Sequence, residues 1–151
     1  MAAGRRPDGL VHVELLEHRP GVAWLGEFLR GKQAALGGPP VRHAGGRAPA
    51  MAVVPDLVKA GVRRVEPMSD QELAAGCGGF DALVMSGGLR HLGEARLTLA
   101  LTAAVRVGTG DGSWLMSRKG SVGDISPAVA AVIAVRDLLQ QPSYSVAGSV
   151  H

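Results

Sequence analysis

The chain has 151 residues, of which 46% are hydrophobic and 3% aromatic, and it carries a formal net charge of +3. This length predicts one domain with a core of small aliphatic side chains, and the mildly basic balance is compatible with a polyanion partner without identifying one. The single cysteine, Cys77, excludes an internal disulfide framework, and its glycine neighbours favour a small buried side chain. No stretch approaches the ~20 apolar residues of a membrane span, and no secretory signal is recognisable. We therefore expect a cytoplasmic protein without a membrane partner.

The first half of the chain predicts strands that alternate with helices. Asp8 and Gly9 form a hairpin-turn signal ahead of the β-rich segment 10–18. Because only seven residues precede Asp8, and most are Ala, Gly or Arg, the chain is expected to begin in the middle of a hairpin. The next elements predicted from apolar spacing are a helix over 22–30, a strand over 41–44, a helix over 51–60 and a strand over 62–67.

The second half continues the alternation and ends in an apolar helix. Ser69 and Glu72 have the spacing of a capping box and open a helix that stops at glycines 87 and 88. The following predicted elements are a connector over 89–93, a helix over 94–107, a turn over 108–112, a strand over 113–117 and a helix that starts near 126. This order predicts an α/β fold, with one domain over 1–141 and a flexible tail over 142–151.

The stretch 117–127 carries the strongest indication of chemistry. Two cations, Arg118 and Lys119, and a Gly/Ser segment deliver Asp124 to the start of the last helix. Either Ser126 or Asp124 can cap this helix, with Pro127 in its first turn. In both cases the carboxylate is stabilised by the positive end of the helix dipole. An acid in this place is often only a cap, so Asp124 has both a structural and a functional interpretation.

Other sequence signals are weaker. The segment 26–33 is close to a phosphate-binding P-loop, but Gln33 stands where the magnesium-binding Ser or Thr is required. Asp56 is expected to be an exposed first-turn helix acid. The best candidates for binding DNA phosphates are Arg90, His91, Arg118 and Lys119. Solvated surface charges explain these residues equally well.

Several blocks of the sequence resemble one protein family. They lie at 5–14, 17–21, 54–57, 60–62, 77–82 and 88–92, and the most specific block combines Trp114, Arg118 and Lys119 with 124–127 before an Ala/Val helix. In this order, over about residues 5–140, they resemble the nuclease part of large terminase subunits of tailed bacteriophages and prophages of actinobacteria.

The resemblance implies a ribonuclease-H-like mixed sheet flanked by helices. It also implies an endonuclease that uses Mg²⁺ or Mn²⁺ to cut concatemeric double-stranded DNA during viral genome packaging, in the bacterial host cytoplasm. Portal and small terminase subunits are its implied partners.

Three acids hold the metal in that family, and Asp124 matches the last of them as a catalytic and metal-binding residue. The first would lie on a strand before Arg5, so the first strand is expected to be missing here. The second would follow His43, where this sequence has Ala44, Gly45 and Gly46. With two of three acids absent, nuclease activity is expected to be impaired. The absent strand leaves an exposed sheet edge, which predicts poor solubility or self-association.

Two other interpretations remain open. The chain could be a non-catalytic remnant of a prophage protein that binds DNA or a partner through Arg90, Arg118 and Lys119. It could also be a small nucleotide-binding α/β domain, although the defective P-loop argues against this.

Overall fold

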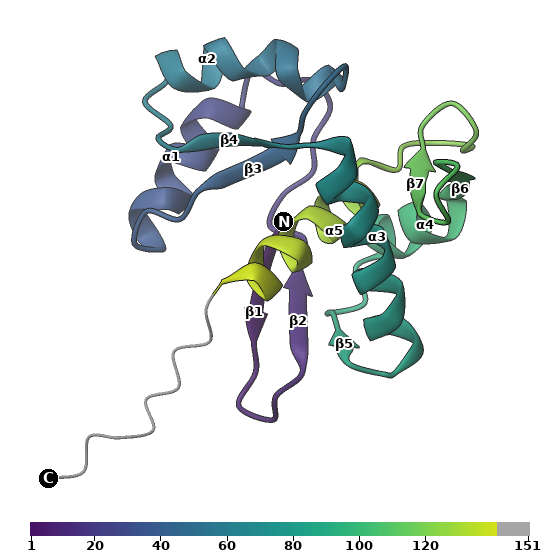
Figure 1. The fold of residues 1–151 in the computed structure, drawn as a ribbon. Coiled ribbons are helices and arrows are strands. Elements are labelled where there is room, and N and C mark those ends of the chain that lie inside the picture. The colour runs from purple at the N-terminus through teal and green to yellow at the C-terminus, as the bar shows by residue number, and fades with distance from the viewer. Residues whose placement is uncertain (142–151) are drawn as a thin grey trace, which may run out of the picture.

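The computed structural model describes residues 1–141 and shows a mixed α/β fold (Figure 1). The strands of this part are β1 (Ala2–Arg5), β2 (Val11–Glu14), β3 (Val41–Ala44), β4 (Val65–Met68), β5 (Leu89–Arg90), β6 (Val105–Gly108) and β7 (Trp114–Ser117). The helices are α1 (Leu25–Ala35), the 3₁₀ turn η1 (Pro49–Val53), α2 (Val54–Lys59), α3 (Asp70–Met85), α4 (Ala95–Ala103) and α5 (Ser126–Gln140). Instead of one sheet, the described strands form three small ones. The predicted tail, 142–151, lies outside the described residues.

The first sheet has β2 at its centre, with β1 antiparallel on one side and β5 parallel on the other. Val11 and Val13 alternate with polar neighbours and are 2% and 1% exposed, as expected for a strand with one buried face. Both arms of the hairpin are present, because β1 pairs with β2 from Ala2 to Arg5. The expectation that the chain begins within a hairpin was therefore wrong. The short, small-residue strand β1 has little propensity of its own and is held by β2 and α5.

The second sheet consists of β3 and β4, which run parallel. The connection between them passes through η1 and α2, and Gly61, with φ of +87°, ends this helical segment as predicted. The predicted helix over 22–30 begins and ends later, and it includes the P-loop-like glycines Gly26 and Gly31. A helical backbone cannot wrap a phosphate as a P-loop does, which agrees with the rejection of that motif.

The third sheet is the hairpin of β6 and β7. The predicted helix over 94–107 was too long, because the helix stops at Ala103 and the chain turns into β6. Arg106 of β6 stacks on the Trp114 ring of β7, 4.2 Å from its centroid, and this cross-strand contact stabilises the hairpin. The predicted connector over 89–93 also contains a short strand, β5, which is fixed by pairing with β2 rather than by local sequence.

Helix α5 joins the first two sheets into one core. Val132 and Val135 pack in a cluster with Val11 and Val13 of β2, whereas Val129 and Ile133 pack in a second cluster with Ala44 and Met68 of the other sheet. The apolar run that the sequence placed in a buried helix is therefore buried between two sheets. Within the described residues, no helix is long and apolar enough to cross a bilayer.

Helix α3 packs closely against α5. It opens at Ser69 with the predicted capping box, in which the Glu72 N–H donates to Ser69 and the Ser69 N–H donates to Glu72. Gly76 lies at the crossing, where a Cβ would stand 3.1 Å from Cγ1 of Val132 and 3.2 Å from Cβ of Arg136. The missing side chain of Gly76 therefore allows α3 and α5 to approach each other closely.

Candidate functional site

Asp124 lies two residues before the first residue of α5 and is hydrogen-bonded to it. The helix begins at Ser126, and Oδ1 of Asp124 accepts hydrogen bonds from the backbone N–H of Ser126, at 2.8 Å, and from its hydroxyl. Gly123, with φ of +98°, supplies the left-handed backbone that turns the chain into this position. The N-cap position is held by Ile125, and no side chain makes a capping bond there, so neither of the two caps that the sequence suggested is used. Asp124 instead binds the N–H of the first helical residue from one position further out.

The second carboxylate oxygen of Asp124 contacts a histidine from the start of the chain. Nε2 of His18 lies 2.9 Å from Oδ2 of Asp124, and His18 lies in the irregular segment that follows β2. Arg96 of α4 donates to the His18 carbonyl and lies 3.5 Å from its Nδ1. An arginine can only donate, so this arrangement fits the tautomer with the proton on Nε2, which then donates to Asp124.

These contacts favour the charged form of Asp124. The hydroxyl and backbone N–H of Ser126 and the His18 ring all hold the pKa of the Asp124 carboxyl below its ordinary value of 3.8, while partial burial opposes them. The Asp124 side chain is 55% exposed, so solvent screens these interactions. At neutral pH the site presents a solvent-accessible carboxylate.

The four predicted phosphate-binding residues are not brought together. Arg118 is adjacent to the site, because its Nη1 lies 3.4 Å from the Ser126 hydroxyl. Arg90 instead donates to backbone carbonyls at the start of its own strand, and Nδ1 of His91 accepts from the Gly93 N–H at 3.0 Å. Lys119 is exposed. Within residues 1–141, no hydrogen bond or ion pair connects Arg90, His91 or Lys119 to Asp124.

The residues at the site do not fit a two-metal centre. No group of three or more His, Cys, Asp or Glu side chains within the described part of the chain is placed to hold a metal ion. Asp124 and His18 meet as a pair, whereas Mg²⁺ and Mn²⁺ require several oxygen ligands. The turn after β3, where the family pattern places an acid, presents Ala44 and Gly45.

His18 and Arg96 were not among the predicted site residues. His18 belongs to one of the family-like blocks, but nothing local marks it as a partner of Asp124, since 106 residues separate the two. Arg96 lies within a predicted helix and looks like an ordinary surface cation. The contact between α4 and the segment after β2, which brings the two residues together, is a tertiary feature that one sequence does not reveal.

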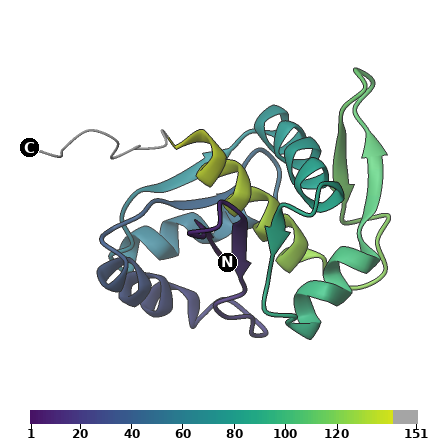
Figure 2. The ribbon, with the colours of Figure 1, turned by 90° about the horizontal axis from the view of Figure 1, so that it is seen from below.

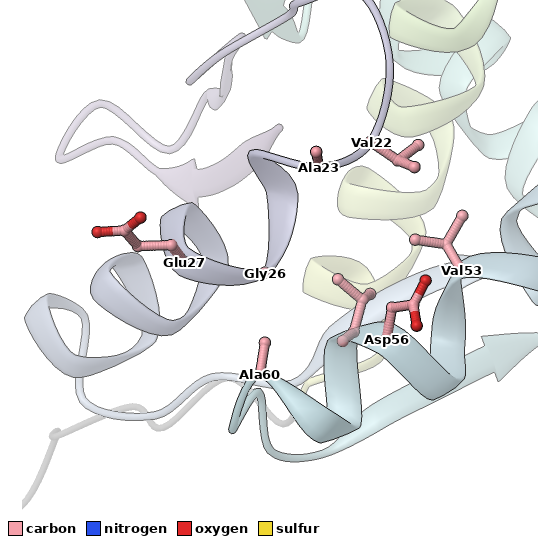
Figure 3. Close-up of a pocket in the computed structure, with 8 residues that line it drawn as sticks. Val22, Ala23, Gly26, Glu27, Val53, Asp56 and Ala60 are labelled. Carbon is pink, nitrogen blue, oxygen red and sulfur yellow. The ribbon is translucent and has the colours of Figure 1, made fainter.

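Two of the hollows on the described surface bear on the site. The smaller, of about 390 Å³, lies between α1 and α2, and Figure 3 shows Glu27 and Asp56 at its two sides. Asp56 is an exposed first-turn acid of α2, as predicted. The larger is a groove of about 840 Å³ that passes the candidate site, where His18 and Arg118 line it. Asp124 itself is not part of either lining.

Comparison of the chain with protein-family models, with curated proteins and with solved structures finds no match. The class of protein is described by its fold and site alone: it is a mixed α/β protein with an Asp–His pair at a helix start, next to two arginines.

Proposed function

We propose that the chain is a partial, ribonuclease-H-like nuclease domain of a terminase large subunit. In this role it acts on concatemeric double-stranded DNA in the bacterial host cytoplasm, alongside portal and small terminase subunits. Its cleavage by Mg²⁺ or Mn²⁺ is weak or absent, because Asp124 is the one acid of the family's three that is present.

The observation that carries this proposal is the placement of Asp124. A carboxylate at the start of the last buried helix lies beside Arg118 and next to His18, which is brought in from the far end of the chain. A cation adjacent to a carboxylate site can hold a phosphodiester near the group that acts on it. The parallel pairing of β3 with β4, and of β2 with β5, is also compatible with a mixed sheet of this class.

The test is a cleavage assay with supercoiled plasmid and either Mg²⁺ or Mn²⁺. We expect no nicking beyond that of the Asp124→Asn variant, because a single carboxylate cannot hold the ions. Robust cutting by the unmodified chain, abolished by Asp124→Asn, would refute the claim that the site is incomplete.

A second candidate function is DNA binding without cleavage. It is favoured by the exposed cations Arg96 and Arg118, which flank the Asp–His pair, and by the net charge of +3. Duplex DNA should then bind with a salt dependence set by the phosphates contacted, and Arg118→Gln should reduce the slope of log K against log salt by about one. Lys59→Gln, an exposed change on α2, is the matched control and should leave the slope unchanged. Equal slopes for both variants would remove Arg118 from the DNA contact.

A further inference from the structure

The larger groove lies between the unpaired edges of two sheets. Strand β1 is the outer strand of its sheet, and β3 pairs only with β4 among the described strands. Residues of both strands line the groove, namely Ala2 and Ala3 from β1 and all four residues of β3. A sheet edge presents backbone N–H and C=O groups that have no partner within the sheet. The groove therefore offers backbone hydrogen-bonding groups on two sides.

Apolar side chains line two further faces of the groove. Ala130 and Ala134, one helical turn apart on α5, are the partly exposed residues of its segment 127–135, which is otherwise buried, and both line the groove. Leu25 and Leu29 of α1 and Val53 of η1 also line it. In Figure 2 the N-terminus lies between α1 and α5. An extended segment in the groove would thus have apolar side chains of α5 on one face and of α1 on the other, as a strand buried on both faces does.

The charges at the ends of the groove are complementary to acids. Lys32 lies beside Gln33, whose amide holds the Pro39 carbonyl just before β3 begins. Arg118 lies at the start of α5, close to where β3 ends, because Ala44 packs with Ile125. No ion pair within residues 1–141 includes Lys32 or Arg118. By contrast, Arg42 in the groove is already paired with Glu66 and Asp137.

We propose that this groove binds one extended strand of another polypeptide, and that this strand is apolar for about five residues and flanked by a carboxylate at each end. Its backbone pairs with the edges of β1 and β3, its side chains pack against α5 on one face and α1 on the other, and its acids meet Lys32 and Arg118. This inference depends on the groove alone and is independent of the proposed nuclease ancestry.

The test uses the full chain and a fluorescent synthetic peptide with five Val or Ile residues between two Asp residues, carried on a Gly/Ser linker for solubility. We expect saturable binding and slowed hydrogen exchange of the β1 and β3 amides. A peptide N-methylated at alternate backbone nitrogens cannot donate to the edges, so it should bind at least about tenfold more weakly. Equal binding of the two peptides, or no binding of either, would overturn the proposal.

Variants inside and outside the groove distinguish binding in the groove from nonspecific hydrophobic binding. Ala134→Arg fills the groove and should weaken binding by at least about tenfold, whereas Leu99→Arg, at an exposed α4 position outside the groove, should not change it. Lys32→Glu should weaken binding of the Asp-flanked peptide and strengthen that of a peptide with Lys at the corresponding end. Equal effects of Ala134→Arg and Leu99→Arg would argue against the groove.

Competing occupants have distinct outcomes. If the chain self-associates through its open edges, saturating peptide should dissociate the assembly in sedimentation experiments. A dimer that persists and excludes the peptide would assign the groove to a second copy. Binding that appears only after deletion of 142–151 would assign it to the chain's own end. Either result would overturn the proposal.

Discussion

His18 and Asp124 approach to 2.9 Å across 106 residues of sequence, and their contact ties the segment after β2 to the start of α5. Because both side chains are partly exposed, at 30% and 55%, the pair is a modest stabilising contact. It matters more for position, since it fixes the direction of the Asp124 carboxylate.

A double-mutant cycle measures this contact. His18→Ala and Asp124→Ala should each destabilise the protein, Asp124→Ala by about 1 kcal/mol because it also removes the hydrogen bond from the Ser126 N–H. The coupling free energy between the two changes should be about 0.2–1 kcal/mol in chemical denaturation. Replacing His18 with Asn, which keeps a donor, should recover part of it. Strict additivity would mean that the pair makes no energetic contact in solution.

The dependence of the unfolding free energy on pH in the acidic range should reflect the lowered pKa of Asp124. A carboxyl whose folded pKa lies below its unfolded value of 3.8 contributes stability above that value, and the contribution is lost as the pH falls through the folded pKa. The difference in unfolding free energy between the unmodified chain and Asp124→Asn should therefore be constant from neutral pH to about pH 5 and shrink below about pH 4. A difference that grows on acidification would contradict the assigned direction.

Two glycines of α1 should respond in opposite directions to alanine. A Cβ on Gly26 would stand 2.6 Å from Cβ of Ala60, so Gly26→Ala should push α1 away from α2 and cost about 1–3 kcal/mol. Gly31, in the same helix, has open space around its Cα, and Gly31→Ala should stabilise by about 0.5–1 kcal/mol through helix propensity. Thermal unfolding of both variants checks the contrast. Similar effects at the two positions would mean that the α1–α2 contact is looser than described.

The stability of the protein should depend on the side-chain amide of Gln33. It is 8% exposed, donates to the carbonyls of Pro39 and Arg63, and accepts from the Arg63 N–H at 3.0 Å. Gln33→Ala should cost about 1–3 kcal/mol, because it leaves buried backbone groups unpaired. Gln33→Glu should cost more at neutral pH than at acidic pH, since only the protonated acid can donate. The exposed Gln71→Ala serves as control and should change denaturation little.

The elements that the sequence predicted well are those with strong local signals. The capping box at Ser69 opens α3, the strand over 41–44 is β3, and the Ala/Val run forms the buried α5. These segments carry their own start signals or a long apolar run, so local and tertiary preferences agree.

The elements that the sequence missed depend on pairing. β1, β5 and β6 are strands because a partner lies beside them, and β6 follows an Ala-rich helix without a breaking residue. The same holds for the site. Asp124 was visible from its helix start, whereas His18 and Arg96 join it only through the tertiary fold.

Because α5 packs against both the β1–β2–β5 sheet and the β3–β4 sheet, and against α3 at Gly76, neither of these sheets can unfold without exposing one side of α5. Unfolding of β3 and β4 would remove the packing partners on one side of α5, and unfolding of β1 and β2 would remove those on the other side. We therefore expect the two sheets to unfold cooperatively, and a calorimetric scan of this chain should contain one unfolding peak.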